Sequence, residues 1–549
     1  MNRSQFLEKT NTIYFDICII GGGATGAGCA LEAQSCGLQT ILIEKEDFGA
    51  GTSSKSTKLI HGGVRYLEQA VKKLSIDQFK MVRKALKERK TLLSMAPHIT
   101  RPLQLITPCR NWVSGMYYFI GLKLYDWISG NRNIGSSKLL SKKQAATFIP
   151  TLNKSALFNA VLYYDGQLDD QRFNLALIQT AVQKGACCIN HCSAVAFEKN
   201  GDGKLSSLTV RDNLSDKSYL IKAKQFINAT GPFADAVRTM ANETLKPRLT
   251  VSKGVHILLP GKLMPTQAAL LIPETKDGRL VFVIPYGNYL LAGTTDDAVP
   301  LTTKEFGPDL NEVRYILEYV NQYLDINATP DMVTAGFGGL RPLITADENA
   351  TKDLVRDHEV EVDASTGLIS IIGGKWTTYR LMAKDTIEAA VENLKPGKDI
   401  TNGFTENILL VGSQHFNKAL LEKAFNDNPQ LSPALIKHIL AKYGDKSLEI
   451  ADDITADPAM AVLLVNELPY SIAELKYVIE NEMACTVKDV LNRRWGVQLF
   501  NWEQTLQLIQ PVGKYMANYF NWNEAEKQLY INDYEQEVRA MMKQLKTQA

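Results

Sequence analysis

Three glycines near the N-terminus are spaced to hold a dinucleotide. Gly21, Gly23 and Gly26 follow a short apolar strand, and their GxGxxG spacing allows a tight turn, a close approach of the backbone to a pyrophosphate and close packing of a helix on the strand. The helix that follows directs its positive N-terminal end at the phosphates. A second apolar strand ends at Glu44, 18 residues after Gly26. A carboxylate there accepts hydrogen bonds from a ribose diol, so we predict a dinucleotide site.

Three cations that follow glycine pairs are candidates for binding a small anion. Arg65, Arg341 and Lys375 each stand within two residues after a Gly–Gly pair, so the backbone and the side chain can converge on one ligand. Arg suits phosphate because its planar fork makes two parallel hydrogen bonds. A single cation is usually a solvated surface charge, but three at glycine turns favour an anionic substrate. His61 and His256 are the candidates for acid–base chemistry, and their spacing does not choose between them.

Two later segments repeat the strand-to-glycine-turn organisation of the N-terminus. A strand over 226–228 leads into the turn 229–231, and a strand over 368–372 precedes a glycine pair and a helix from about Thr377. Such turns lie where open α/β sheets bind ligands. The chain has one GxGxxG motif, which means a bound NAD or a bound FAD and not both. The N-terminal position of the motif and the two later returns favour FAD, whose flavin distant segments must grip.

These elements predict an α/β fold with three parts. A Rossmann-like FAD-binding domain is discontinuous, an α+β substrate domain is inserted in it, and an all-α domain follows at the C-terminus. Residues 250–335 are rich in strand patterns, the polar segment 391–407 is typical of a linker, and the remainder is helical with few glycines. The predicted boundaries are 1–100, 150–250 and 336–395 for the FAD-binding domain, 101–149 and 251–335 for the substrate or cap domain, and 405–549 for the helical domain.

Composition excludes several other classes of protein. The chain has 549 residues, 45% of them hydrophobic, and a net charge of +2, which gives no argument for nucleic-acid binding. The N-terminus lacks the apolar core of a secretory signal, and the eight cysteines do not form a disulfide framework. Cys187, Cys188, His191 and Cys192 lie close together, but their spacing matches no standard zinc site. We expect a buried strand over 186–196 and no metal.

One apolar segment, 112–128, is short of a membrane span because Lys123 and Asp126 interrupt it. Its apolar residues fall on one helical face, with aromatic residues at both ends and arginines nearby. This arrangement suits a helix that lies in a membrane interface. An amphipathic helix that covers a core is the alternative.

The chain resembles the FAD-dependent glycerol-3-phosphate dehydrogenases over nearly its whole length. The motifs that carry the resemblance lie at 52–68, 95–98, 228–232, 253–256, 282–285, 293–296, 339–343 and 373–380, and in the helical tail at 443–445 and 482–494. Trp376 replaces the Leu usual in the last core motif. The absence of a mitochondrial-type leader and of an EF-hand loop favours the bacterial form.

The resemblance implies a reaction and the residues that perform it. The C2 hydroxyl of sn-glycerol 3-phosphate is oxidised to the ketone of dihydroxyacetone phosphate, with a hydride passing to the flavin. Arg341 and His256 are the expected catalytic residues, and Arg65, Tyr66, Arg356 and Lys375 the expected substrate-binding residues. The residues expected to hold FAD are Gly21, Gly22, Gly23, Thr25, Gly26, Glu44, Lys45, Thr52, Ser53, Ser54, Lys58, Leu59, Ile60, His61, Gly62, Val195, Ala229, Thr230, Gly231, Gly374, Lys375 and Thr377.

The resemblance also implies partners and a location. A membrane quinone reoxidises the flavin, so we expect a cytoplasmic protein held peripherally on the inner face of the cytoplasmic membrane. The helical domain suggests a homodimer. Three alternatives stay open: a soluble oxidase that passes electrons to O2 and releases H2O2, a related flavin oxidase acting on amino acids, and a non-catalytic flavoprotein scaffold. The cluster of cations argues against the last two.

Overall fold

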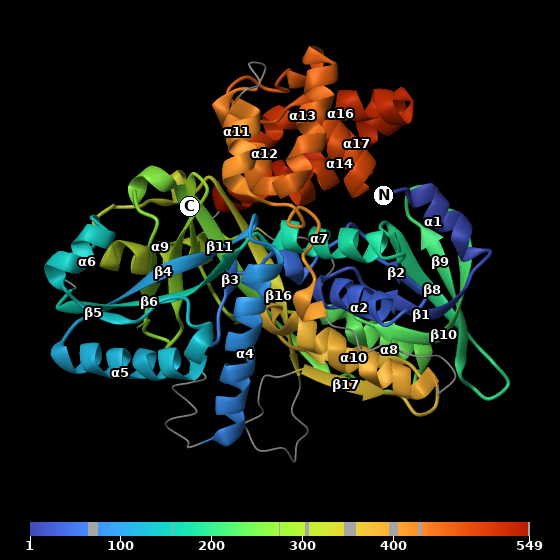
Figure 1. Cartoon of the computed structure of the whole chain (residues 1–549), viewed down its shortest axis with the longest axis horizontal. Helices are drawn as coiled ribbons and strands as arrows, with labels where there is room; N and C mark the ends of the chain where they lie inside the picture. The colour runs from blue at the N-terminus through green and yellow to red at the C-terminus, as the bar shows by residue number, and fades with distance from the viewer. Residues whose placement is uncertain are drawn as a thin grey trace.

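The computed structural model describes residues 1–63, 75–155, 157–273, 275–301, 307–344, 358–394, 405–426 and 431–546. Three residues of the predicted substrate site, Arg65, Tyr66 and Arg356, lie outside the described residues, as does most of the predicted linker. Figure 1 shows two sheet-based bodies side by side, with the C-terminal helices across one side of both.

The first sheet is built around the glycine turn. Its strands lie in the order β17-β18-β10-β1-β2-β7, with the β8–β9 hairpin attached to β10, and β18, β10, β1, β2 and β7 run parallel. Strand β1 therefore has later strands on both sides, which opens a crevice at its carboxyl end. The bounds are β1 Tyr14–Ile20, β2 Thr40–Ile43, β7 Cys187–Ile189, β8 Cys192–Lys199, β9 Leu205–Asp212, β10 Ser218–Asn228, β17 His358–Val362 and β18 Ile369–Gly373.

Helices pack on this sheet because its strands are apolar on both faces. Ile17, Ile19 and Ile41 are fully buried, as expected for parallel strands covered on both sides. Helix α2 contacts both α7 and α10, while α8 contacts β10 and β18, and α1 contacts β7 and β10. The bounds are α1 Arg3–Thr10, α2 Ala24–Ser35, α7 Asp170–Gln183, α8 Ala234–Ala241 and α10 Tyr379–Leu394. The predicted strand–turn–helix–strand unit is thus confirmed.

The second sheet is mostly antiparallel. Its order is β15-β11-β14-β13-β12-β4-β6-β3, with β16 paired to β11 and β5 paired to β6. One face shares a core with α6 and α9, and the other shares a core with the C-terminal helices. The strands are β3 Leu59–Ile60, β4 Thr100–Cys109, β5 Lys138–Ser141, β6 Asn159–Leu168, β11 Leu249–Pro260, β12 Ala269–Ile272, β13 Val281–Tyr286, β14 Tyr289–Gly293, β15 Asp297–Ala298 and β16 Ala335–Ile344, and the helices are α4 Ile76–Met95, α5 Trp112–Ser129, α6 Lys142–Phe148 and α9 Leu310–Tyr323.

The C-terminal part is helical, as predicted. Its core centres on Trp495, Leu475 and Ile509, all fully buried. In Figure 1 these orange and red helices lie across both sheets. The bounds are α11 Lys418–Asn426, α12 Pro433–Tyr443, α13 Ser447–Ala456, α14 Ile472–Glu482, the π-helix η10 Asp489–Arg494, α15 Val497–Phe500, α16 Trp502–Phe520 and α17 Glu524–Lys546.

Two details of the sequence-based predictions differ from the structure. The single strand expected over 186–196 is two strands, because His191 has a φ of 50° and turns the chain between them. Strand β7 then stays in the parallel sheet, and β8 leaves it to pair with β9. Strands β6 and β16 join the second sheet, although the predicted boundaries place their residues with the FAD-binding domain. Each pairs over ten positions with a strand of the second sheet, and this ladder fixes its membership.

Helix α5 is buried on one side only. Gly115, Leu122, Tyr125 and Ile128 face the protein, whereas the apolar residues between them are exposed or half-buried. Within the described ranges, the molecule contains no helix with the length and apolar character that crossing a bilayer requires.

Candidate functional site

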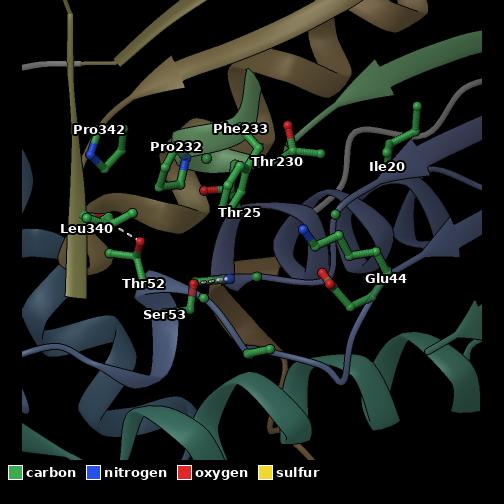
Figure 2. Close-up of a pocket in the computed structure, with 18 of the residues that line it drawn as sticks. Ile20, Thr25, Glu44, Thr52, Ser53, Thr230, Pro232, Phe233, Leu340 and Pro342 are labelled. Atoms are coloured by element: carbon green, nitrogen blue, oxygen red, sulfur yellow. Dashed lines mark hydrogen bonds between the residues drawn. The ribbon is translucent and has the colours of Figure 1, made fainter. Parts of the chain in front are cut away.

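A cavity of about 500 Å³ opens at the carboxyl ends of the parallel strands, where open α/β sheets bind ligands. Figure 2 shows Glu44 toward one end, Leu340 and Pro342 toward the other, and Thr25 between them. Segments from the whole length of the two-sheet part meet here. The described residues that line the cavity include Gly21, Gly23, Thr25, Glu44, Lys45, Thr52, Ser53, Lys55, Ala194, Ala229, Thr230, Gly231, Phe233, Leu340, Pro342, Gly374, Lys375 and Trp376.

The glycine turn leaves room for a pyrophosphate. Gly21 has a φ of 109°, and a Cβ on Gly26 would lie 1.9 Å from the carbonyl oxygen of Gly21. A side chain at Gly26 would therefore push α2 away from the turn, and one at Gly21 would meet the Ala229 carbonyl oxygen at 2.6 Å. Ala24 begins α2 and donates its N–H to Ser53 Oγ at 2.9 Å. The N-terminal end of α2 thus faces the cavity through Ala24 and Thr25, as anion binding requires.

The Glu44 carboxylate is held in place by hydrogen bonds from backbone N–H groups, one of them in the glycine turn. Its Oε2 accepts a hydrogen bond from the Gly22 N–H at 2.7 Å, and its Oε1 accepts one from the Glu46 N–H at 3.0 Å. Burial raises the pKa of Glu44 above its ordinary value, against the lowering effect of these two donors. Nearby, the Lys45 ammonium lies 4.6 Å from the ring centroid of Phe233, and both residues line the cavity. Ribose binding by Glu44 stays a prediction.

The loop 52–58 forms one wall and is tied to three distant segments. Thr52 Oγ1 donates to the Leu340 carbonyl at 2.5 Å, and the Trp376 indole N–H donates to the Ser53 carbonyl at 2.7 Å. Lys58 is buried, and its ammonium pairs with Asp170 and donates to the Ser54 carbonyl. Lys58 therefore holds the loop against the start of α7. It is not among the described residues that line the cavity.

Some of the residues predicted to hold FAD do not line the cavity. Among the described residues, those predicted for the cofactor that do not line the cavity are Gly22, Gly26, Ser54, Lys58, Leu59, Ile60, His61, Gly62, Val195 and Thr377. Val195 is 49% exposed, and its neighbour Ala194 lines the cavity instead. The sequence reasoning missed Phe233 and Lys55 as lining residues. Phe233 stands two residues after the predicted cofactor residue Gly231, and this proximity is the signal in the sequence that could have found it.

Arg341 and His256 meet on one face of the β11–β16 pair. Gly338, Leu340 and Pro342 line the cavity, and because side chains alternate along a strand, Arg341 shares the other face with His256 and Gly254. Gly254 makes room for Arg341, since a Cβ there would lie 2.2 Å from Nη2.

The Arg341 guanidinium donates hydrogen bonds to the segment 294–296, and its charge acts on His256. Arg341 donates from Nη1 to the Thr295 carbonyl at 3.1 Å and to Asp296 Oδ1 at 2.9 Å, and from Nη2 to Thr294 Oγ1 at 2.9 Å. Burial, then Arg341 and Lys58, lowers the pKa of His256 to about 3, so this imidazole is neutral.

The His256 ring is held by one hydrogen bond and one stacking contact. Its Nε2 lies 3.0 Å from Thr57 Oγ1, and the ring stacks on Phe337 with centroids 5.2 Å apart. Its Nδ1 is buried and has no partner among the described residues. Among the described residues, His256 lines neither the main cavity nor the small pocket, so its catalytic role stays a prediction.

His61 and Lys375 line a second, small pocket, and Lys375 lines the main cavity as well. Gly62, Gly63 and Thr377 also line the small pocket, and the His61 N–H donates to Thr377 Oγ1 at 3.3 Å. Burial lowers the pKa of His61 despite the nearby Asp165 carboxylate, and the charge of Lys375 lowers it further. Lys375 lines both spaces, and among the described residues it is the predicted substrate-binding cation that reaches the main cavity.

Comparisons with known proteins agree with this geometry. A family model described as FAD dependent oxidoreductase matches residues 16–380, and one described as the C-terminal domain of alpha-glycerophosphate oxidase matches residues 404–527. The chain is 41% identical over 539 residues to the mitochondrial glycerol-3-phosphate dehydrogenase of Homo sapiens, covering 96% of this chain and 73% of that protein.

Solved structures show the same likeness. The glycerol-3-phosphate dehydrogenase from Bacillus halodurans complexed with FAD superposes with a TM-score of 0.78 at 29% identity, covering 98% of this chain and 97% of that one. A dithionite-reduced L-alpha-glycerophosphate oxidase from Mycoplasma pneumoniae has a TM-score of 0.54 at 17% identity, covering 71% of this chain and 98% of that one, a likeness of fold alone.

The two-sheet fold and the cavity are those of an FAD-dependent oxidoreductase. Within that class, the chain belongs to the family of FAD-dependent glycerol-3-phosphate dehydrogenases. FAD is the cofactor, and the residues present fit it. The glycine turn approaches the cavity without side chains, and the cavity continues from Glu44 to Lys375. The predicted fold class and cofactor are confirmed.

Proposed function

We propose that this chain oxidises sn-glycerol 3-phosphate at its C2 hydroxyl and releases dihydroxyacetone phosphate. The observation that carries the proposal is the set of groups around the dinucleotide cavity. Lys375 lines the cavity, and Arg341 and the neutral His256 lie together on the strand pair whose other face lines it. A phosphate ester requires such cations. The relatives named as glycerol-3-phosphate dehydrogenases supply the substrate class.

Each residue has a distinct part in the proposed reaction. When bound, FAD supplies a hydride acceptor at the flavin N5. The N-terminal end of α2 and the glycine turn hold the pyrophosphate, and Glu44 holds the adenosine ribose. As the hydride leaves C2, His256 accepts the hydroxyl proton through its unpartnered Nδ1, and Arg341 stabilises the negative charge that develops at the reacting oxygen. Lys375 binds the phosphate together with the predicted Arg65, Tyr66 and Arg356.

An anaerobic titration tests the substrate. The purified FAD-loaded protein is mixed with glycerol 3-phosphate without O2, and the flavin absorbance is followed. We expect the oxidised flavin band to bleach. An amino acid that bleaches the flavin while glycerol 3-phosphate does not would overturn the assignment, and a flavin that no small molecule reduces would indicate a binding scaffold.

We further propose that a membrane quinone accepts the electrons and that α5 is the segment that meets the membrane. Trp112, Val113, Ile120 and Trp127 of this helix are 62%, 69%, 62% and 74% exposed. Side chains of this size exposed along one helix are costly in water and suit the interfacial region of a bilayer, where aromatic residues settle at the headgroup level. The placement on the inner face of the cytoplasmic membrane and the homodimer are further parts of this proposal.

Vesicle binding tests the membrane surface separately from catalysis. Flotation of the holoenzyme with vesicles of mixed phosphatidylglycerol and phosphatidylethanolamine is expected to carry the protein, and Ile120→Ser with Trp127→Ser to reduce the bound fraction. Leu529→Ser is a matched control, because Leu529 is 56% exposed on α17. Equal loss in the control, or no loss in the α5 variant, contradicts the assignment of this surface.

The electron acceptor is tested by peroxide. The match of residues 404–527 to a domain named for alpha-glycerophosphate oxidase makes the O2-using enzyme the second candidate. We expect little H2O2 per turnover when a soluble quinone analogue is present and slow turnover without it. Stoichiometric H2O2 at full rate without a quinone would establish the oxidase instead.

A further inference from the structure

A buried hydrogen-bond relay lies directly behind the loop of His61, Gly62 and Gly63. The Gly62 N–H donates to Tyr125 Oη at 2.7 Å, and Tyr125 Oη donates to Asp165 Oδ1 at 2.8 Å. Tyr125 is 1% exposed on the inner side of α5, and Asp165 is buried in β6. The hydroxyl therefore joins two partners within the protein and has no route to solvent.

At its other end, the relay includes the buried ion pair between Asp165 and Arg89. Arg89 of α4 donates from Nη1 to Asp165 Oδ1 at 2.6 Å and to the Tyr164 carbonyl at 3.0 Å, and from Nη2 to Ser129 Oγ of α5 at 3.1 Å. The Arg89 side chain is fully buried. A buried ion pair persists only with good geometry and extra hydrogen bonds, so this pair gives the Tyr125 hydroxyl one orientation.

The near end of the relay is a close packing contact. A Cβ on Gly62 would lie 2.7 Å from Tyr125 Oη and 2.7 Å from Leu86 Cδ2. The backbone of the loop therefore rests against α4 and α5 without an intervening side chain. Leu86, Val82, Tyr125 and Ile128 form a small hydrophobic cluster of their own at this point.

The same loop also lines the small pocket that contains Lys375, the predicted substrate-binding cation. His61, Gly62 and Gly63 line the small pocket together with Lys375 and Thr377, and the His61 N–H donates to Thr377 Oγ1. Lys375 also lines the main cavity. A displacement of Gly62 would thus move the surface against which Lys375 is placed.

We propose that Tyr125 is a positioning residue of the glycerol-3-phosphate site: its hydroxyl, oriented by Asp165 and Arg89, fixes the Gly62 N–H and through it the loop opposite Lys375. Tyr125 acts through the loop and does not touch the reacting atoms. Burial, then Asp165, raises the pKa of Tyr125 well above its ordinary value, so the hydroxyl keeps the proton that it donates. This inference rests on the proposed function for its substrate.

The variant Tyr125→Phe removes the hydroxyl and keeps the buried ring. The Gly62 N–H then loses its acceptor, and we expect kcat/KM for glycerol 3-phosphate to fall about tenfold, as the loss of one hydrogen bond with a buried donor left unpaired predicts. The Kd for FAD is expected to stay within twofold, because other segments line its cavity. This contrast between substrate turnover and cofactor binding is a readout that general destabilisation would not produce.

Tyr164→Phe is the matched control. Tyr164 is the neighbour of Asp165 on β6, and its hydroxyl accepts from Gln104 Nε2 at 3.2 Å, outside the relay, so wild-type kinetics are expected. Unchanged kcat/KM in Tyr125→Phe overturns the proposal, and so does a loss that follows FAD release or unfolding. If Tyr125→Phe fails to fold, Ser129→Ala weakens the orientation of Arg89 more gently, and unchanged kcat/KM there is the overturning result. Failure of wild-type flavin reduction by glycerol 3-phosphate would instead reject the substrate.

Discussion

Gly254 controls the position of Arg341, and the substitution Gly254→Ala tests whether that position matters for catalysis. A methyl group at residue 254 would lie 2.2 Å from Nη2, 2.5 Å from Cζ and 2.6 Å from Nη1 of Arg341. These are non-bonded distances that atoms cannot adopt, so the guanidinium must move away. The atoms that must move are the far end of a flexible side chain, so the β11–β16 ladder can stay intact.

The size of the effect follows from the contacts that Arg341 would lose. A charge-assisted hydrogen bond contributes about 1.5–3 kcal/mol, and each ~1.4 kcal/mol corresponds to a factor of ten. If one such contact to the reacting group is lost, kcat/KM for glycerol 3-phosphate falls about 10- to 100-fold. The thermal midpoint should change by only a few degrees, because Ala is easily accommodated in an extended strand.

Initial rates with a soluble quinone analogue measure this effect. Gly121→Ala is the control, since Gly121 lies in α5 and a Cβ there meets nothing within 4 Å. A double-mutant cycle adds a second check, because Gly254→Ala should cost little more once Arg341→Ala has removed the guanidinium. Wild-type kinetics in Gly254→Ala, or full additivity with Arg341→Ala, would refute the reasoning.

Three further predictions concern the cofactor, the pH dependence of stability and the pH profile. Trp376→Phe keeps an aromatic ring but removes the indole N–H that donates to the Ser53 carbonyl, so FAD should dissociate about 2- to 12-fold faster. The fluorescence of released flavin measures this rate, and an unchanged rate would show that this hydrogen bond does not help to hold FAD. Burial alone would lower the pKa of His191, but its pair with Asp489 raises it. That stabilisation is complete below the unfolded pKa of ~6.5 and is lost as the pH rises through the higher folded value. The excess Tm of wild type over His191→Gln should therefore shrink as the pH rises above the unfolded pKa, and a constant excess is the contrary result. Because His256 has a pKa of about 3, its substitution by Gln should lower kcat/KM without moving the midpoint of any acid limb between about pH 5 and 8, and a shifted midpoint would show that His256 titrates there.

The sequence predicts local features of the site well because their causes are local. The turn from Gly21 to Gly26 and the acid at 44 depend on one strand, one helix and the glycines between them, so spacing alone is sufficient. The helix that begins after Ser75 is similarly predictable, since its cap accepts the Gln78 N–H three residues on. In each case the deciding contacts lie within about one supersecondary unit.

Features that depend on contacts between distant parts of the chain could not be predicted from the sequence. The motif around Lys58 predicts a cofactor residue, but Asp170, more than a hundred residues later, takes its ammonium. The turn between β7 and β8 is a similar case. His191 has a positive φ there, and its imidazole pairs with Asp489 of the helical domain. The predicted boundaries place most of β6 and β16 in the FAD-binding domain, whereas ladders over ten positions to β4 and β11 put both strands in the second sheet.

The helical domain supports the cofactor cavity without lining it. Among the described residues, the cavity lining ends at Met382, yet the π-helix contributes Arg494, which pairs with the buried Asp47 and donates to the Glu482 carbonyl at 2.8 Å. Asp47 stands three residues after Glu44, in the segment whose backbone holds that carboxylate. Arg172 makes a second buried pair, bidentate to Glu482 at 2.7 and 2.6 Å. Because a buried charge left without its partner is strongly destabilising, the two pairs allow one docking of the helical domain, and that docking fixes the Glu44 wall of the cavity.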